Sequence, residues 1–273
     1  MTTKITPDMT VLSETLLIPL WAKAVEQERD ERLLTDPEAP RMLAQIDYDF
    51  SKFKNIVMSQ VGCCGRAQIF DNEAQKFIAA HPDAVVVQLG AGLDARFERL
   101  GRPQITAWYD LDLPEVIALR RQLLPESTNH YLAISLFDES WMQTVAAHGK
   151  PVLLLCEGVL MYFDTDTVKD WLATLARHLP QATLVFDIVP PVLVGKANKH
   201  DALGKMGKEA PEFKWSLKDN RELEQWLPGL KLEEEIELSR VCGRRYLLIA
   251  RLIYATKWGR RKMDQHIVRV RLP

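Results

Sequence analysis

A buried strand that runs into a glycine turn is the feature that most restricts how this chain can fold. Residues 84–89 read Ala-Val-Val-Val-Gln-Leu and are followed directly by Gly90, Ala91 and Gly92. An uncharged run rich in β-branched residues is typical of a strand buried on both faces, as in a parallel sheet. Both glycines can adopt positive φ and leave backbone amides bare for a ligand. The pattern predicts a cofactor-binding turn at these three residues, with a tight turn that binds nothing as the alternative.

Two carboxylates at the end of the next predicted strand strengthen this prediction. Residues 105–114 form a second apolar segment that carries Asp110 and Asp112, 20 and 22 positions after Gly90. An acid at this place accepts hydrogen bonds from the ribose hydroxyls of an adenosine-containing cofactor. Either acid could instead cap the helix that begins near Leu113-Pro114. Because residues 90–95 fit the pattern Gly-x-Gly-x-x-Ala, a dinucleotide and S-adenosylmethionine both remain open at this point.

The order of the predicted elements indicates an α/β fold with two parts. Residues 1–83 are predicted to form a mainly helical N-terminal cap, with helices at 13–28, 36–46, 48–57 and 65–80, the last of which packs on the sheet. Residues 84–273 are predicted to form the core, in which strands at 84–89, 105–114, 131–136, 152–159 and 182–188 alternate with helices at 113–124, 139–147 and 164–179. This alternation predicts a parallel, doubly wound sheet that binds ligands at the carboxyl ends of its strands.

The pattern changes after the fifth predicted strand. Residues 189–228 are predicted to form a lid insertion, in which 189–214 lack a sustained period and 215–227 form a helix. The irregular part has few apolar anchors and contains Lys196, Lys199, Lys205 and Lys208. A strand at 230–238, a helix at 244–258 and a strand at 265–272 follow, and the strict alternation of the last is typical of an edge strand. The glutamates of the first strand and the arginines of the last favour pairing between the two.

The overall charge and the cysteines exclude several classes of function. A formal charge of −2 gives no global attraction to nucleic acid or to an anionic membrane, although charges are spread unevenly near the end of the chain. Four cysteines without zinc-like spacing predict no metal site and fit a reducing cytoplasm. No segment reaches the about 20 apolar residues of a membrane span or resembles a signal peptide, so we expect a soluble cytoplasmic protein.

Four ordered blocks of residues resemble one known family. They are Arg66 with Phe70-Asp71, and then residues 88–94, 109–114 and 156–162. Together they resemble the leucine carboxyl methyltransferase family, and more closely its bacterial branch that resembles the tetracenomycin polyketide O-methyltransferase. The resemblance implies a class I S-adenosylmethionine-dependent methyltransferase with a Rossmann-like, seven-stranded sheet whose last strand is antiparallel. It also implies S-adenosylmethionine as the methyl donor and a carboxylate as the acceptor.

The same resemblance implies roles for individual residues. Arg66 would pair with the methionine carboxylate of the donor, Gly90 would line the donor with bare backbone, and Asp112 would hold the ribose. Glu157 would lie beside the sulfonium and the amino group. Its position at the end of an apolar strand independently requires a partner, because an unpaired buried charge costs several kcal/mol. Ser135-Leu136 would lie near the adenine, where the eukaryotic members carry Asp-Leu, and Ser135 can accept a hydrogen bond from the adenine amine without supplying a charge.

Few side chains qualify for a catalytic role. Tyr162 is the one catalytic candidate, although a tyrosine at such a place more often packs than reacts. Cys63-Cys64 are expected to be buried small hydrophobes, and His200 to be a solvated residue of the lid. A carboxylate acceptor is already ionised at pH 7 and needs no base, whereas a phenol or an alcohol does. Since no convincing base lies near the strand ends, the sequence favours a small carboxylic acid as the acceptor, with the lid closing over it.

Two alternatives belong to other classes of protein. An NAD(P)-dependent Rossmann oxidoreductase would explain the glycine turn and Asp110, but Gly101-Arg102-Pro103 stops the following helix within three turns. A non-catalytic scaffold that binds S-adenosylmethionine would keep the sheet but has no reason to keep Arg66, Glu157 and a lid together. The sequence predicts neither the identity of the acceptor nor the oligomeric state.

Overall fold

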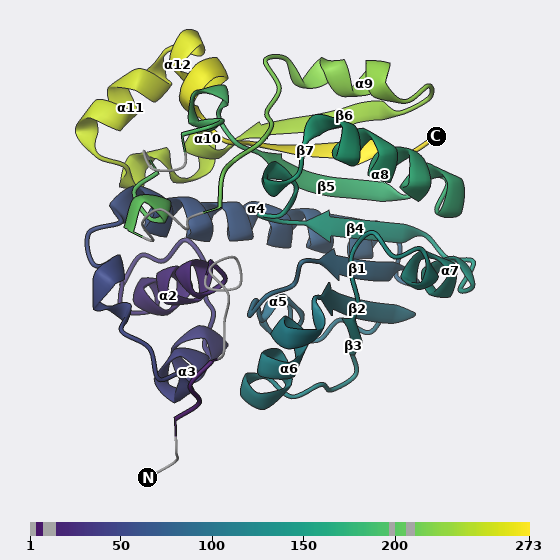
Figure 1. The fold of residues 1–273 in the computed structure, drawn as a ribbon, viewed down its shortest axis with the longest axis horizontal. Coiled ribbons are helices and arrows are strands. Elements are labelled where there is room, and N and C mark those ends of the chain that lie inside the picture. The colour runs from purple at the N-terminus through teal and green to yellow at the C-terminus, as the bar shows by residue number, and fades with distance from the viewer. Residues whose placement is uncertain (1–3, 8–14, 197–199, 206–210) are drawn as a thin grey trace.

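A seven-stranded mixed sheet forms the centre of the molecule (Figure 1). The structure is a computed structural model that describes residues 4–7, 15–196, 200–205 and 211–273. The strands are β1 (Val85–Leu89), β2 (Ala107–Asp112), β3 (His130–Ala133), β4 (Val152–Cys156), β5 (Thr183–Ile188), β6 (Lys231–Glu237) and β7 (His266–Arg271). Their order is β3-β2-β1-β4-β5-β7-β6, with β1 to β5 parallel and β7 antiparallel to both of its neighbours. The predicted doubly wound sheet with an antiparallel last strand is confirmed.

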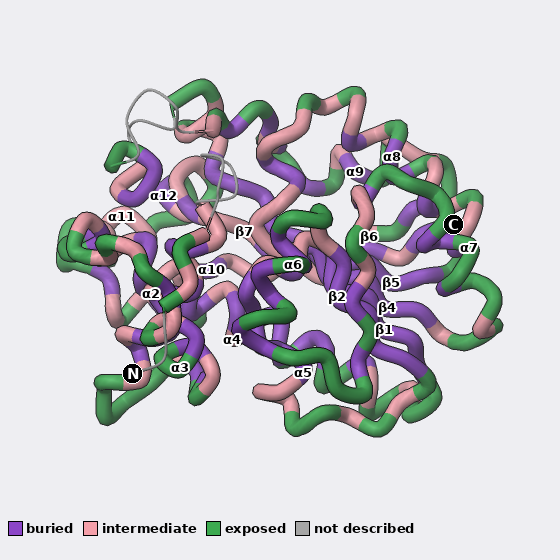
Figure 2. Tube along the Cα trace, turned by 60° about the horizontal axis from the view of Figure 1, so that its bottom comes forward, coloured by how far each residue is buried: buried purple, intermediate pink, exposed green. Residues whose placement is uncertain are grey.

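Helices cover both faces of this sheet, lie beyond the carboxyl ends of its parallel strands and form one corner of the molecule (Figure 1). They are α2 (Leu17–Glu26), α3 (Glu38–Gln45), α4 (Val57–Ala80), α5 (Arg96–Arg99), α6 (Pro114–Leu123), α7 (Ser140–Ala146), α8 (Thr165–His178), α9 (Leu223–Trp226), α10 (Leu238–Cys242), α11 (Leu248–Ala255) and α12 (Lys257–Met263). One apolar cluster joins α7 and α8 to one face, and another joins α4 and α10 to the opposite face. The inner strands β1, β4 and β5 are therefore buried on both sides (Figure 2). The uncharged sequences of β1 and β4 predict this, whereas β5 also carries the buried Asp187.

The last strand is an interior strand, and the prediction that it lies at the edge is wrong. β7 is inserted between β5 and β6, so that β6 forms the edge of the sheet. Alternation arises here because Val268 and Val270 pack into the core while Arg269 and Arg271 point to the other face. On that face Arg269 Nη1 forms an ion pair with Glu234 Oε2 of β6 at 2.8 Å. The predicted pairing of the acidic strand with the basic strand is confirmed.

Two predicted helices of the N-terminal region have other boundaries. Residues 48–57 form only a short 3-10 turn at Phe50–Phe53, because Asn55 takes a left-handed conformation (φ 76°) that ends any helix there. The next helix, α4, then runs for 24 residues from Val57, eight residues before its predicted start at 65. The helices α2 and α3 lie beyond the carboxyl ends of the parallel strands, whereas α4 extends along the sheet (Figure 1).

The predicted helices at 215–227 and 244–258 are also shorter than expected. Trp215 is buried and its indole donates to the Leu160 carbonyl at 2.5 Å, so the chain is helical only from about residue 220. The second segment divides into α11 and α12, and the Thr256 hydroxyl between them accepts from the Gly259 amide at 2.9 Å. A Cβ atom at residue 259 would lie 1.9 Å from the Ile253 carbonyl oxygen. Glycine is therefore required where the two helices meet.

Helix α4 makes an equally close approach to α10. A Cβ atom at Gly65 would lie 2.7 Å from the Cys242 Sγ atom and 2.8 Å from its Cβ atom, whereas one at Gly62 would meet only the Tyr246 hydroxyl and Leu238, at 3.8 and 4.0 Å. The two glycines are one helical turn apart in the same helix. They therefore offer a matched test of how tightly this layer is packed.

We predict that Gly65→Ala lowers the free energy of unfolding by about 1–3 kcal/mol, because an added methyl group must displace the buried Cys242. Gly62→Ala should be neutral or stabilise the protein by up to about 1 kcal/mol, since alanine is the better helix former. Urea unfolding followed by circular dichroism measures both. Equal midpoints for the two variants would contradict the close packing of α4 on α10.

Candidate functional site

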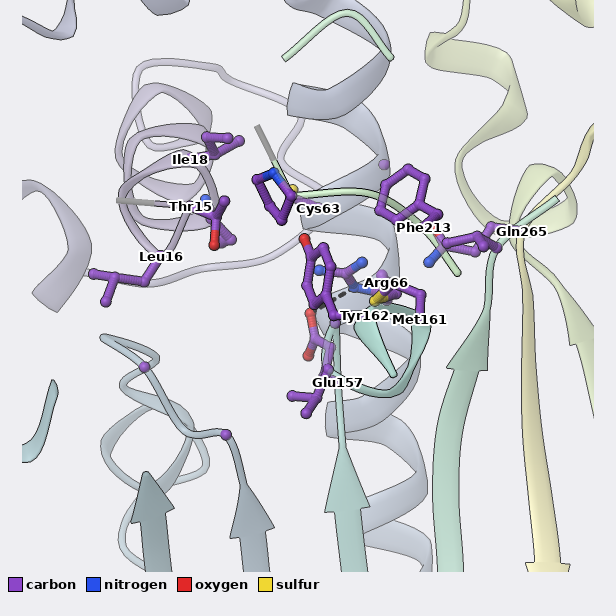
Figure 3. Close-up of a pocket in the computed structure, with 18 of the residues that line it drawn as sticks. Thr15, Leu16, Ile18, Cys63, Arg66, Glu157, Met161, Tyr162, Phe213 and Gln265 are labelled. Atoms are coloured by element: carbon purple, nitrogen blue, oxygen red, sulfur yellow. Dashed lines mark hydrogen bonds and ion pairs between the residues drawn. The ribbon is translucent and has the colours of Figure 1, made fainter. Parts of the chain in front are cut away.

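A cavity of about 1060 Å³ lies at the carboxyl ends of the parallel strands (Figure 3). Its floor is formed by the ends of β1, β2 and β4, and its walls come from α2, the first half of α4 and the described parts of residues 189–214. The topology places it there, because β1 and β4 are adjacent and their chains leave the sheet in opposite directions, towards β2 and β5. The cavity therefore lies where the sequence predicts a ligand.

The glycine turn is shaped by close contacts as well as by backbone conformation. Gly90 and Gly92 have φ values of 65° and 51°, and both line the cavity together with Ala91. A Cβ atom at Gly90 would lie 2.3 Å from a methyl group of Val159. No other residue fits at position 90, and the backbone of the turn stays open to the cavity.

Asp112 is tied to this turn. Its two carboxylate oxygens accept from the Gly92 and Leu113 amides, each at 2.7 Å. Burial raises the pKa of Asp112, and these two amides oppose the rise. Since Asp112 also lines the cavity, it is in place to accept further hydrogen bonds from a ligand.

Asp110, the other candidate for the ribose, is not brought to the cavity. It lies one pleat further into the sheet and is fully buried. Its carboxylate accepts from Asn129 Nδ2 at 2.6 Å and from the Trp108 indole at 3.1 Å, and it pairs with Arg120 at 3.3 Å. These protein partners occupy Asp110, so the structure leaves Asp112 as the acid available to a ligand.

The segment after β3 completes this side of the cavity. Ser135 and Leu136 both line it. The Ser135 hydroxyl accepts from the Phe137 amide at 3.2 Å, and the Leu136 carbonyl accepts from the indoles of Trp141 and Trp171 at 3.1 and 3.2 Å. The segment is thereby fixed next to β2, where both residues were expected.

Arg66 and Glu157 meet at the opposite side of the cavity, beside Tyr162 (Figure 3). Arg66 Nε lies 2.9 Å from Glu157 Oε1, and Arg66 Nη1 lies 3.2 Å from Asp187 Oδ2. The second oxygen of Glu157 pairs with Arg96 Nη2 at 2.5 Å. Burial raises the pKa of Glu157, but Arg96 and Arg66 outweigh it and hold that pKa below its usual value. The partner that Glu157 needs is thus supplied by the protein itself.

The ion pairs continue from Arg96 into the N-terminal helices. Arg96 pairs with Asp94 at 3.0 Å, and Asp94 pairs in turn with Lys23 of α2 at 2.9 Å. Arg99 Nη1 lies 2.8 Å from Asp94 Oδ1 and 2.8 Å from Asp36 Oδ2. Asp36 lies just before α3. We call the connected set the buried ion network; its members are Lys23, Asp36, Arg66, Asp71, Asp94, Arg96, Arg99, Glu157 and Asp187.

Several residues of this site were missed in the sequence. Lys23, Asp94 and Gln88 line the cavity but had no assigned role. Gln88 was detectable, because it is the one polar side chain within the uncharged strand that leads to Gly90. It is 3% exposed, and its Oε1 atom has no hydrogen-bond partner among the described residues. The residue lines the cavity, but this oxygen atom itself is buried.

The remaining wall of the cavity is largely apolar. Met161, Tyr162 and Phe213 line it, and the two aromatic rings are 5.8 Å apart. Burial raises the pKa of Tyr162 to about 12, so its phenol is protonated at neutral pH and can donate but not act as a base. Cys64 is buried as predicted, whereas Cys63 is only half-buried and lines the cavity. Burial raises the pKa of both thiols, which keeps them protonated and unreactive at neutral pH.

His200 lines the cavity too, and it is half-buried there instead of being a lone solvated residue as predicted. Burial lowers the pKa of His200, and Asp201 only partly opposes this effect. The imidazole is therefore mainly neutral at pH 7, in the form that can accept a proton. Among the residues that the structure describes, His200 is the side chain of this wall best suited to act as a base.

The described part of the predicted lid is anchored to the rest of the protein. Asp201 accepts from the Met58 and Ser59 amides at the start of α4, at 3.0 and 3.1 Å. Leu203 and Phe213 are buried, so apolar anchors are present where the sequence was expected to offer few. Lys196 and Lys205 are exposed and do not line the cavity. Lys199 and Lys208 lie outside the described residues.

The charges and the lining of the cavity suit S-adenosylmethionine. The backbone at Gly90 has no Cβ atom between it and the cavity, and Asp112 lines the same cavity. The buried ion network contains one more acidic side chain than basic ones, which suits a donor whose sulfonium and ammonium outweigh its carboxylate. Within the described ranges no cluster of side chains could hold a metal ion. Among the same residues, every helix is too short or too polar to traverse a bilayer.

Comparisons with known proteins agree with this fit. Residues 17–176 match the leucine carboxyl methyltransferase family. The chain is 35% identical to the tetracenomycin polyketide synthesis O-methyltransferase TcmP of Streptomyces glaucescens, over 83% of each chain. It is 29% identical to the S-adenosyl-L-methionine-dependent methyltransferase dpfgK of Gibberella zeae, over 84% of this chain and 83% of that one. The solved structure of a SAM-dependent methyltransferase from Anabaena variabilis aligns with all of this chain and 99% of its own at a TM-score of 0.53 and 7% identity, which shows a common fold.

We predict that stability falls in acid because of the buried ion network. Lys23, Arg96 and Arg99 outweigh the effect of burial and hold the pKa of Asp94 well below its usual value. A carboxylate with a lowered folded-state pKa stabilises the fold fully above its unfolded value of about 4, and this contribution is lost as pH falls through the folded pKa. Asp94→Asn should lower the unfolding free energy at pH 7 by about 3–5 kcal/mol and flatten its decline in acid.

Urea unfolding between pH 7 and pH 3 measures both effects. Asp83→Asn is the matched control, because Asp83 pairs with Lys150 at the exposed surface and should change the curve far less than Asp94→Asn does. An Asp94→Asn variant with the stability and acid response of the wild type would show that the network does not hold the fold.

Proposed function

The chain belongs to the leucine carboxyl methyltransferase family and is an S-adenosylmethionine-dependent methyltransferase, and we propose that it methylates a carboxylate oxygen of a small-molecule acid. The comparisons decide against both a nicotinamide oxidoreductase and a scaffold without activity. The acceptor class is our inference. The observation that carries it is the family match, because that family is named for the methylation of a carboxyl group.

We infer that the donor is held mainly by the strand ends. Asp112 would accept from its ribose hydroxyls, Ser135-Leu136 would contact its adenine, and the turn at Gly90 and Gly92 would face it with bare backbone. Asp112 is supported in this role by its fixed position: with Gly92 and Leu113 as donors, its carboxylate needs no rearrangement before a ligand binds. Bound S-adenosylmethionine supplies a methyl group on a positively charged sulfur.

We further infer that Arg66 and Glu157 contact the amino-acid half of the donor. Arg66 is held between Glu157 and Asp187, and its side chain keeps 13% of its surface exposed at the cavity. A guanidinium has five N–H donors, so two carboxylate partners leave capacity for a third. Glu157 keeps its charge because its pKa is lowered, and its carboxylate suits an ammonium or sulfonium nearby.

The role of the protein on the acceptor side would be to position the acid and to exclude water. A carboxylate is ionised at neutral pH, so no base is needed, and a protonated Tyr162 could donate a hydrogen bond to it. Met161 and Phe213 make this wall apolar, which strengthens the attraction between an anionic acceptor and the cationic donor. The described anchors of residues 189–214 favour a covered cavity; closure over the acceptor stays a prediction.

A hydroxyl acceptor is the second candidate, and one observation favours it. His200 lines the cavity in its neutral form, with Asp201 Oδ1 at 3.9 Å from its Nδ1 atom. A neutral imidazole could take the proton of a phenol. The relative from Streptomyces glaucescens is named as an O-methyltransferase of polyketide synthesis, and that name does not specify a carboxyl oxygen.

We predict that Asp112→Asn weakens the binding of S-adenosylhomocysteine by about ten- to two-hundredfold, the loss expected for charged hydrogen bonds to the ribose. Asp110→Asn is the matched control, since its partners are Arg120, Asn129 and Trp108 and it does not reach the cavity. It should lower the melting temperature with little change in affinity. Calorimetry well below each melting point measures the binding, and equal losses of affinity in both variants would contradict the assignment.

The stability of the product in base distinguishes the two acceptor classes. We predict that carboxylic acids, in a screen with labelled donor that also includes phenols and amines, give products that release labelled methanol in mild base. Methyl esters hydrolyse under these conditions, whereas methyl ethers and methylamines survive. A base-stable product whose formation is lost in His200→Ala would favour the hydroxyl acceptor and overturn the carboxylate proposal.

A further inference from the structure

Helices α11 and α12, with the residues that lead into them, carry the most exposed apolar side chains in the described part of the chain. Leu247, Leu248, Ile249, Leu252 and Trp258 are between 60% and 75% exposed. No other large apolar side chain among the described residues exceeds 41%. Exposure of this extent, concentrated in one element, marks an interaction surface. We call residues 247–258 with their outward side chains the α11–α12 tip.

The tip is held to the protein by its inner face. The rings of Tyr246 and Tyr254 pack 5.6 Å apart, and the Tyr254 hydroxyl donates to the Met263 carbonyl at 3.2 Å. Ala250 and Tyr254 pack against the apolar cluster that also contains α4. Figure 1 shows α11 and α12 at a corner of the molecule, outside the layers that flank the sheet. The tip is thus a fixed part of the fold whose outer face projects into solvent.

The chain segment that contains the tip carries charges of one sign only. Residues 238–263 contain eight basic side chains and no acidic one, although the whole chain has a formal charge of −2; the basic residues are Arg240, Arg244, Arg245, Arg251, Lys257, Arg260, Arg261 and Lys262. Arg245 and Arg260 are taken up by internal ion pairs with Glu26 and Glu237. Arg244, Arg251 and Lys257 are exposed and form no ion pair with a described residue. They are free to attract an anionic surface.

The combination of exposed apolar side chains and unpaired basic side chains argues against a second copy of the chain and against nucleic acid as the partner. A second copy of the chain, joined by the same face about a twofold axis, would bring the unpaired basic residues of both copies together. Nucleic acid would be attracted by the charges but would gain nothing from exposed leucine and isoleucine side chains. An anionic lipid surface uses both features, because its phosphates attract the basic residues and its acyl boundary accepts the aliphatic ones.

We propose that the α11–α12 tip docks on the surface of an anionic lipid bilayer. The aliphatic side chains and Trp258 enter the boundary between headgroups and acyl chains, while Arg244, Arg251 and Lys257 contact lipid phosphates. The helices lie on the membrane and do not cross it, since α11 has only eight residues. Tyr254 of α11 and Met263 of α12 line the cavity. Docking of the tip would therefore bring the wall of the cavity that these two residues form close to the membrane.

Co-sedimentation of the full chain with lipid vesicles tests this proposal and needs no methyl acceptor. Vesicles in which a third of the lipid is phosphatidylglycerol should bind the wild type, and vesicles of phosphatidylcholine alone should not. Arg251→Glu should weaken binding by about fivefold for each unit of charge changed. Ile249→Ser should weaken it by at least about tenfold, because several buried carbons are lost from the acyl boundary.

Lys150→Glu is the matched control, as it makes the same change of charge at an exposed site in the loop between α7 and β4. It should bind like the wild type, and all three variants should keep the circular dichroism and melting temperature of the wild type. Failure of the wild type to bind anionic vesicles overturns the proposal, as does binding that neither tip variant weakens. A dimer in sedimentation velocity that Ile249→Ser abolishes, without vesicle binding, would assign the face to a second copy instead.

Discussion

The buried ion network is the constraint on which the arrangement of the site depends. It connects Lys23 of α2 through Asp94 and Arg96 to Glu157 at the end of β4, and so joins the helical cap to the sheet. Burying so many charges is expensive, and apolar residues of the same volume would often give equal stability. The network fixes the position of the helical cap relative to the sheet. An ion pair or a hydrogen bond tolerates little displacement, so the cap is held in one arrangement over the cavity. The same carboxylates set the negative potential that a cationic donor meets.

Local patterns in the sequence predict the parts of the fold that depend on local chemistry. The strands β1 and β4 were predictable because they carry no charge on either face, and Gly90 because a glycine-rich turn directly follows β1. The helix at α4 was placed too late because nothing in the residues themselves shows that Asn55 takes a left-handed conformation. Where a helix ends is thus decided by single residues whose conformation depends on their surroundings.

The pairing of charged residues with one another could not be predicted from the sequence. Arg66 and Glu157 were both selected as site residues, yet they are 91 positions apart and their pairing with each other is a product of the fold. Asp110 and Asp112 differ only in that one lies a pleat deeper, under Arg120. Likewise, the small net charge of the chain gives no hint that residues 238–263 contain only basic charges. This basic segment indicates an interaction surface only once the structure shows that its apolar residues are exposed.

The position of β7 in the sheet has a consequence for the time course of synthesis. β6 has β7 as its only neighbour, and in chain order it is made before α10, α11, α12 and β7. A nascent chain that has just completed β6 therefore carries a strand with nothing to pair with, next to a β5 whose edge is still bare. Unpaired strands of this kind are where chains aggregate. The glutamates at 233, 234, 235 and 237 give the unpaired β6 a negative charge, so that the β6 strands of two nascent chains repel each other. The arginines of β7 neutralise part of this charge once the sheet is complete.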